Sequence, residues 1–370
     1  MQATMRGGEV SMLYVGVDAH KQFCQAAVVE ESGDVLGEYR FENSEEGITG
    51  LASRLDAFGK PVKVAVESTA NLWIQVYDRL EASGFQVVLS NPAKTRVIAE
   101  ARIKTDKVDA KILAQLLRAD MLPLCYVPSV EERGRRQLIR ERMSLVKART
   151  EVKNRVQSLL HRCGFRCPYG DLFSKRGLEW LRGLNFNDVD VVVLKSGLAL
   201  LDALDEQVAA LESHVAASAV VDERVRLLMT MPGIDYFAAS LLVSEICDIG
   251  RFRSDKALVC WAGLAQSLHQ SGKVTQIGRI TRQGNSCVRW VLVQCAQTAR
   301  LHDERLRGFY EGYARRKGHG KAVVAVAHEM LRIVYFMLKR MEPYRGEDRR
   351  LTGVKVKRLE RKANFSLHAP

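Results

Sequence analysis

The chain has 370 residues, of which 47% are hydrophobic, so it can bury the cores of two or three domains and is not intrinsically disordered. Lys and Arg number 56 against 43 Asp and Glu, and the net charge of +13 favours an anionic partner, either nucleic acid or a membrane surface. We expect a cytoplasmic protein with no membrane partner, because no secretory signal or uncharged transmembrane stretch is visible and eight cysteines are scattered singly.

Strand and helix signals alternate over the first 120 residues. We expect a strand over MLYVGV ending at Asp18, followed by a hairpin of FCQAAVVE and DVLGEYRF joined by ESGD. A helix capped by Asn43 comes next, and then a strand over VKVAVE that ends at Glu67. A helix over LWIQVYDRLEASG and the strand QVVLS follow, with helix to about Asp120. This order, β-β-β-α-β-α-β-α, predicts an α/β sheet with an antiparallel start and a parallel continuation. It is a ribonuclease H-like order of elements.

Residues from about Glu131 to Val215 show apolar positions at heptad spacing. The repeats are Leu138, Leu145, Val152 and Leu159 on a first helix, and Leu201, Leu204, Val208, Leu211 and Val215 on a second. They predict two short coiled-coil helices that form either an antiparallel hairpin or a dimer seam, with ordinary amphipathic packing as the alternative.

The first of these helices is strongly basic. From Glu131 to Arg162 it holds ten Lys and Arg against four acids. Its arginines, among them Arg135, Arg142 and Arg149, are therefore candidates to contact an RNA or DNA backbone, and a solvated helical face is the alternative.

From about Val225 we expect helices joined by loops, followed by a basic, solvated tail that contacts phosphate. The segment QSGKVTQIGRITRQGNS is polar and glycine-rich, so we expect a loop in which Lys273, Arg279 and Arg282 neutralise a phosphate. The expected domains span residues 12–125, 131–220 and 225–342, with the tail over 343–370.

Four acidic residues form the candidate site. Asp18 and Glu67 end neighbouring parallel strands, whose carboxyl ends meet at the edge of an α/β sheet where sites form. Asp106 and Asp109 share one face of the helix that opens in KTDKVDAK. Four carboxylates brought together repel one another unless a cation lies between them, and oxygen ligands of this kind suit Mg²⁺ or Mn²⁺.

Two such ions beside one phosphate can activate a nucleophile and stabilise the leaving oxygen. Lys104 and Lys107, on either side of Asp106, would then counter the phosphate charge. Taken singly, each acid has a plainer interpretation as a turn residue, and Asp106 as the cap of its helix.

The segments YVGVDAHK, VAVES and KTDKVDAKILAQLL resemble the DEDD insertion-sequence transposases, the IS-one-ten family, which begin with a RuvC-like domain. The later segments LLMTMPGIDYFAASLLVSEI, RFRSDKALVCWAGL and SGKVTQIGRITRQGNSCVRWVLVQCA resemble that family's C-terminal transposase domain. The resemblance extends from about Tyr14 to Arg340. It implies that the metal-binding tetrad is Asp18, Glu67, Asp106 and Asp109.

The resemblance also implies a serine nucleophile, for which Ser271 in HQSGK is the best match. Ser286 in GNSCVRW is the rival, although it lies near the start of a predicted helix and could instead be its N-cap. Two positions depart from the family pattern: Ala265 replaces a usual proline, and the run after Glu67 is STAN rather than Thr-Gly and an aromatic residue.

The implied fold is therefore α/β plus α, with a ribonuclease H-like (RuvC-like) N-terminal domain, a helical coiled-coil middle and a mostly helical C-terminal domain. The implied activity is Mg²⁺-dependent recombination through a phosphoserine intermediate, guided by a bridge RNA that pairs with donor and target DNA. The resemblance further implies dimers that assemble into tetramers, with the tetrad of one subunit joined to the serine of another, and association with the nucleoid when active.

Three other functions compete with this interpretation. A Holliday-junction nuclease would use the same tetrad to activate water and would not need Ser271. A sugar or acid kinase of the actin-like class shares the first elements, but the chain lacks a second glycine-rich phosphate loop after a later strand. A degenerate, RNA-binding relative would have lost metal binding.

Overall fold

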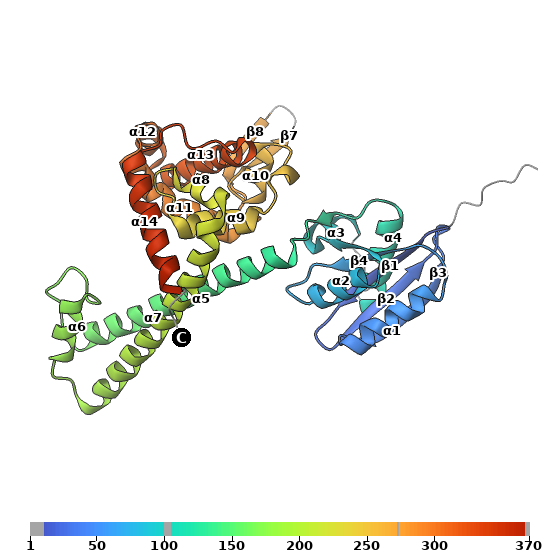
Figure 1. Cartoon of the computed structure of the whole chain (residues 1–370), viewed down its shortest axis with the longest axis horizontal. Helices are drawn as coiled ribbons and strands as arrows, with labels where there is room; N and C mark the ends of the chain where they lie inside the picture. The colour runs from blue at the N-terminus through green and yellow to red at the C-terminus, as the bar shows by residue number, and fades with distance from the viewer. Residues whose placement is uncertain (1–10, 100–104, 272–273, 367–370) are drawn as a thin grey trace, which may run out of the picture. The chain divides into compact units, whose positions relative to one another are not determined.

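The structure is a computed structural model that describes residues 11–99, 105–271 and 274–366 (Figure 1). The chain divides into two compact units, with the boundary between Val127 and Pro128. Each unit has its own hydrophobic core. The first combines a sheet with helices and the second is mostly helical, so the predicted α/β plus α class is confirmed.

A six-stranded sheet forms the centre of the first unit. Its order is β3-β2-β1-β4-β5-β6. The first three strands are an antiparallel meander, and β4 and β5 run parallel to β1, as the sequence predicts. The two-residue β6 pairs antiparallel to β5 and was not predicted, because so short a strand leaves no hydrophobic alternation. The strands are β1 Leu13–Ala19, β2 Phe23–Val29, β3 Val35–Glu42, β4 Val62–Glu67, β5 Gln86–Ser90 and β6 Leu124–Cys125.

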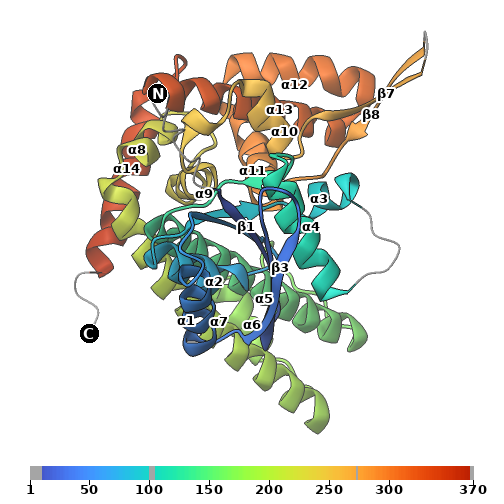
Figure 2. The same cartoon turned by 90° about the vertical axis from the view of Figure 1, so that its right-hand side faces the viewer.

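Helices cover both faces of this sheet (Figure 2). Helices α1 (Glu45–Asp56) and α2 (Trp73–Ala82) bury their apolar residues with Leu13, Val15 and Val17 of β1. Helix α4 (Asp106–Arg118) buries Leu113 and Leu117 on the opposite face. The short α3 (Pro92–Ile98) follows β5.

The predicted cap of α1 is wrong by one residue. Ser44, not Asn43, accepts the hydrogen bond from the Gly47 amide, at 3.2 Å. The Asn43 side chain instead donates to the His20 carbonyl at 2.8 Å, which ties the turn after β1 to the end of β3. Both residue types cap helices well, so the sequence alone could not separate them.

The second unit begins with two long antiparallel helices, α5 (Val130–Arg162) and α7 (Asp188–Val221), joined through α6 (Lys175–Arg182). Their direction follows from ion pairs in reverse order along the chain. These are Arg135–Asp222, Arg142–Glu212, Arg149–Asp205 and Arg162–Asp190. The predicted heptad residues Val152, Leu159, Leu201, Val208 and Val215 are buried. Of the two predicted arrangements, the structure contains the hairpin within one chain.

The remaining elements build the largest core. They are α8 Glu223–Met229, α9 Tyr236–Ile246, the 3-10 turn Ile249–Arg251, α10 Asp255–Trp261, β7 Gln266–Ser271, β8 Val274–Ile280, α11 Ser286–His302, α12 Glu304–Lys317, α13 His319–Arg340 and α14 Arg349–Ser366. None of the helices within the described ranges is long and apolar enough to cross a membrane.

Two expectations for this unit are wrong. The polar segment after Ala265 is not a loop but a β-hairpin of β7 and β8, in which β-branched residues such as Val274 and Ile280 favour extended backbone. The tail is not simply solvated, because α14 packs along α7 (Figure 1). Leu359 is fully buried, and Lys355 donates to the carbonyls of Met229 and Met231 at 2.6 and 2.8 Å.

Candidate functional site

The carboxyl ends of two neighbouring strands bring Asp18 and Glu67 together. Strands β1 and β4 pair in parallel with Val17 opposite Val66, so the next residue on each strand is an acid. Asp18 is 7% exposed, whereas Glu67 is half-buried and accepts a hydrogen bond from the Thr69 hydroxyl at 3.1 Å. The predicted placement of both acids at one sheet edge is therefore what the structure shows.

A glycine lets α4 deliver the other two acids to this edge. A Cβ atom at Gly16 would lie 2.1 Å from the Ala110 carbonyl oxygen and 2.6 Å from the Ala114 amide nitrogen. The helix therefore packs directly on the β1 backbone, two residues before Asp18, and its first turn carries Asp106 and Asp109. The helix is capped by Thr105, whose hydroxyl accepts from the Val108 amide at 3.3 Å, so the capping interpretation of Asp106 is wrong.

His20 is part of this cluster and was not predicted. Its Nε2 atom lies 3.1 Å from Asp18 Oδ2 and 3.2 Å from Asp106 Oδ1. One donor atom from each of these three residues lies within 4.8 Å of the other two. The signal was present in the sequence as Asp-Ala-His, since residues two apart at a strand end point to the same side.

The acids interact with one another through space. Burial raises the pKa of the Asp18 carboxyl above its usual range, His20 partly lowers it, and the charges of Glu67, Asp106 and Asp109 raise it further. The charges of the other three predicted acids therefore all affect the Asp18 carboxyl. A concentration of negative charge on a buried carboxylate is what a bound cation would relieve.

The donor atoms fit a divalent cation. Neighbouring ligands of an octahedral ion bound at about 2.1 Å are separated by about 3 Å, and the two His20 distances, 3.1 and 3.2 Å, agree with this. Carboxylate oxygens suit Mg²⁺ and Mn²⁺ alike, and an imidazole nitrogen favours Mn²⁺ of the two. Asp18, His20 and Asp106 thus form a candidate ligand set, with Glu67 and Asp109 beside it.

The lysines near the acids are differently placed. Lys104 lies outside the described residues. Lys107 approaches Glu38 of β3 at 3.4 Å, and Lys111 also pairs with Glu38 and is the main reason why the pKa of that carboxyl is lowered. The ammonium group of Lys107 is nevertheless accessible, since 65% of its side chain is exposed.

The second predicted site lies on the β7–β8 hairpin. Ser271 is the last residue of β7 and pairs with Val274, and Lys273 lies outside the described residues. The base of the hairpin is fixed by backbone bonds from Thr281 to Ala265 at 2.8 Å and from Asn285 to Trp261 at 3.0 Å. Arg279 and Arg282 are exposed near this base.

Asn285, not Ser286, caps the helix that follows the hairpin. Its side chain accepts from the Val288 amide at 3.0 Å and donates to Glu245 at 2.7 Å. Glu245 is 1% exposed and is held by the Arg140 guanidinium through two bonds of 2.8 and 2.9 Å. Ser286 is the exposed first residue of α11, so its interpretation as an N-cap is wrong.

The three α5 arginines predicted to contact nucleic acid are ion-paired within the second unit. Arg135 binds Asp222 at 3.0 Å, Arg142 binds Glu212 at 2.5 Å and Arg149 binds Asp205 at 2.7 Å. The sequence could not reveal these acids as partners, because they lie 56 to 87 residues away along the chain.

Comparison with known proteins identifies the family. Residues 15–164 match the DEDD transposase family model, described as a transposase, and residues 225–311 match a model described as the transposase IS116/IS110/IS902 family. A chain described as a transposase, y4qE, of Sinorhizobium fredii is 30% identical over 78% of this chain and 72% of its own length. The chain belongs to the IS110 transposase family. The predicted family is thereby confirmed.

Other relatives span most of the chain. The transposase for insertion sequence element IS1111A of Coxiella burnetii is 24% identical over 90% of this chain and 91% of its own length. A pilin gene-inverting protein of Moraxella bovis is 23% identical over 90% and 98%. Membership in the IS110 family makes this chain an enzyme of DNA transposition and recombination, and both family models fall on regions that carry a candidate site.

Proposed function

We propose that the chain is a Mg²⁺- or Mn²⁺-dependent recombinase of a mobile element that cuts and rejoins DNA through a phosphoserine intermediate. The observation that carries the proposal is the convergence of Asp18, Glu67, Asp106 and Asp109 on one sheet edge in a member of this family. In this proposal residues 12–125 are a ribonuclease H-like (RuvC-like) catalytic domain and residues 225–342 a transposase domain that supplies Ser271. Residues 131–220 are the helical connection, and residues 343–370 form the basic tail.

The tetrad and His20 would hold the cation, which when bound supplies neutralisation of phosphate charge and polarisation of the phosphate. The Ser271 hydroxyl would pass its proton to a basic group of the assembled site, and its oxygen would bond to phosphorus while the bond from phosphorus to one DNA oxygen breaks; that oxygen takes up a proton. A DNA hydroxyl later gives up its proton in the same way and attacks the same phosphorus, and the released serine oxygen is protonated again. The number of phosphodiester bonds is therefore conserved and no ATP is needed.

Basic residues near each site would position the substrate. Lys104 and Lys107 flank Asp106, and Lys273, Arg279 and Arg282 belong to the serine hairpin. Arg135, Arg142 and Arg149 would contact nucleic acid only by sharing or exchanging their carboxylate partners, because each is already ion-paired. We therefore rank them below the hairpin arginines as backbone ligands.

The resemblance noted from the sequence further supports a guide. We propose that a structured bridge RNA pairs with donor and target DNA of the nucleoid, and that dimers assemble into tetramers for strand exchange. The similarity to a pilin gene-inverting protein supports recombination rather than simple hydrolysis.

A covalent-adduct assay tests the chemistry. The protein, purified with its RNA, is incubated with Mg²⁺ and labelled DNA spanning the element's ends, and the products are separated on a denaturing gel. We expect a metal-dependent protein–DNA band that is lost in Ser271→Ala and in Asp109→Ala. Ser286→Ala is the matched control and should keep the band.

Two outcomes would redirect the assignment. Cleaved DNA without an adduct in any lane would favour the Holliday-junction nuclease, in which water replaces the serine. An adduct lost in Ser286→Ala but kept in Ser271→Ala would move the nucleophile to the start of α11.

A further inference from the structure

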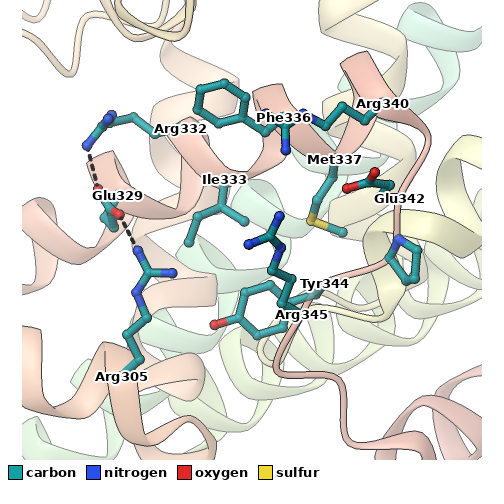
Figure 3. Close-up of a pocket in the computed structure, with 11 residues that line it drawn as sticks. Arg305, Glu329, Arg332, Ile333, Phe336, Met337, Arg340, Glu342, Tyr344 and Arg345 are labelled. Atoms are coloured by element: carbon teal, nitrogen blue, oxygen red, sulfur yellow. Dashed lines mark hydrogen bonds and ion pairs between the residues drawn. The ribbon is translucent and has the colours of Figure 1, made fainter.

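A pocket of about 280 Å³ lies in the second unit, between α13, α12 and the segment that leads to α14 (Figure 3). Its volume is close to the lower end of the range for small-molecule sites, about 300–1,000 Å³. Phe336, Met337 and Arg340 come from α13, and Tyr344 and Arg345 come from the following segment. None of these residues belongs to the metal cluster or to the serine hairpin.

The floor of the pocket is apolar and offers an aromatic face. Ile333, Met337 and the buried Tyr344 line it, and Phe336 is 40% exposed. The Tyr344 hydroxyl donates to Asp303 at 2.8 Å, which fixes that ring as part of the wall. An exposed aromatic side chain beside a cavity is suited to stacking on a flat ligand.

The rim carries four arginines and two glutamates, Glu329 and Glu342, so its net charge is positive. Arg305 and Arg332 share Glu329, each at 3.1 Å, and Arg332 also binds Asp255 at 2.7 Å. Within the described part of the chain, Arg340 and Arg345 have no carboxylate at ion-pair distance. The Arg340 guanidinium lies over one face of the Phe336 ring, 5.4 Å from its centroid, so a guanidinium without a carboxylate partner adjoins an exposed aromatic ring.

We infer that this pocket binds one unstacked nucleotide of a single-stranded nucleic acid. The base stacks on the face of Phe336 that Arg340 does not cover, and its phosphate is bound by Arg340 and Arg345. A guanidinium binds phosphate oxygens through paired hydrogen bonds, and aromatic side chains stack on any base. The site would therefore distinguish a single strand from a duplex, but not one base sequence from another. The inference rests on the family's action on nucleic acid and not on Ser271 or the metal centre.

The charge of the second unit supports this class of ligand. Residues 128–370 hold 42 Lys and Arg against 26 Asp and Glu. An anionic polymer is therefore drawn to this unit, whereas the pocket's apolar floor would remain unused by duplex DNA, whose bases are stacked inside the helix.

Fluorescence anisotropy on the full-length protein tests the inference. The probes are fluorescein-labelled oligouridylate RNA, oligothymidylate DNA and a blunt DNA duplex, all of equal length, in EDTA so that no cleavage occurs. We expect Phe336→Leu to weaken binding of a single strand about five- to tenfold, because stacking is lost while the side chain stays apolar. Phe336→Tyr keeps the ring and should bind like the unmodified protein, and duplex binding should not change.

Arginine variants give a second readout. Arg340→Ala should reduce the slope of log affinity against log salt by about 0.7, the value for one contact to a single strand. Arg349→Ala, an exposed arginine of α14 outside the pocket, is the matched control and should alter single-strand binding less. Weakening of the RNA probe alone, or of the DNA probe alone, would assign the nucleotide to that strand.

The inference is overturned if Phe336→Leu and Arg340→Ala bind both single strands as well as the unmodified protein does. It is also overturned if they weaken duplex binding equally, since the pocket would then not select unstacked bases. Because no cleavage is measured, failure here leaves the proposed chemistry untouched, and loss of the covalent adduct in the other assay would leave this inference untouched.

Discussion

At the scale of single residues, the candidate metal site depends on how little solvent reaches Asp18. Only 7% of this residue is exposed, while the nearby acids and His20 are more accessible. Water solvates the charge of a buried carboxylate poorly, so the group either protonates more readily or binds a cation. Asp18 is therefore the member of the tetrad whose replacement reports most directly on the electrostatics of the site.

We predict that Asp18→Asn changes how stability depends on pH in the absence of metal. The folded-state pKa of Asp18 lies above its ordinary value of 3.8, so ionisation costs folding free energy, and stability falls as pH rises from about 3.8 through the raised pKa. Asn cannot ionise and escapes this loss. Thermal melts in EDTA should show the unmodified protein losing stability relative to Asp18→Asn as pH rises through that window.

Added Mn²⁺ should reverse the order near neutral pH, because only the unmodified protein keeps the buried carboxylate. Asp120→Asn is the control, since Asp120 is an exposed acid after α4 and should follow the unmodified protein. Parallel stability curves for the unmodified protein and Asp18→Asn would contradict the raised pKa.

At the scale of elements, the contact of α4 with β1 decides whether the four acids meet. Gly16 permits the contact, and Ala110 and Ala114 supply the small residues on the helix side. In the second unit, charged residues rather than small ones join α5 and α7. Their paired charges hold two helices together, so arginines that look like a nucleic-acid surface in the sequence are largely part of the fold.

We predict that Gly16→Ala lowers the free energy of unfolding by about 1–3 kcal/mol and weakens metal binding, because the added methyl group would push α4 and its two acids away from β1. Urea unfolding measures the first effect and calorimetry with Mn²⁺ the second.

Gly50→Ala is the matched control. It lies within α1 with no heavy atom within 4 Å of the new methyl group, so it should be neutral or add up to about 1 kcal/mol. If Gly16→Ala binds Mn²⁺ like the unmodified protein, the position of α4 does not control the site.

At the scale of the whole molecule, the positive charge is unevenly divided. Residues 1–127 hold 14 Lys and Arg against 17 Asp and Glu, whereas residues 128–370 hold 42 against 26. The unit with the acidic cluster is thus slightly acidic, and the excess that favours nucleic acid belongs to the helical unit. Electrostatic attraction and the proposed metal chemistry are therefore assigned to different parts of the chain.

We predict that metal binding and nucleic-acid binding separate when the two units are expressed on their own. Residues 128–370 should bind DNA and RNA with an affinity that falls steeply as salt rises, and residues 1–127 should bind Mn²⁺ but nucleic acid only weakly. Filter binding over a salt series and calorimetry measure the two properties, with thermal melts to confirm that each piece is folded. Tight, salt-dependent DNA binding by residues 1–127 would contradict this division.

Much of the fold follows from local pattern. The alternation of strands such as VKVAVE with amphipathic helices identified the elements of the first unit. The heptad spacing of Val152 and Leu159, and of Leu201 and Val208, predicted two helices with a hairpin as one of two arrangements. Asp18, Glu67, Asp106 and Asp109 could be proposed as one group because parallel strand ends share an edge. The predicted helix cap was wrong because Asn43 and its neighbour Ser44 are both good capping residues. The predicted loop was wrong because polar residues form the strands β7 and β8.

What the sequence determined by itself is the family and the list of acids, because these depend on residue types at short spacings along the chain. Only the tertiary structure decided that His20 joins Asp18 and Asp106, that the α5 arginines are neutralised by acids of α7, and that Phe336 and Arg340 line a pocket with Arg345. The physical reason is that ligand sets, ion pairs and cavities are made by distances in space. A chain pattern fixes such distances only within one helix or strand, and the packing between elements fixes the rest.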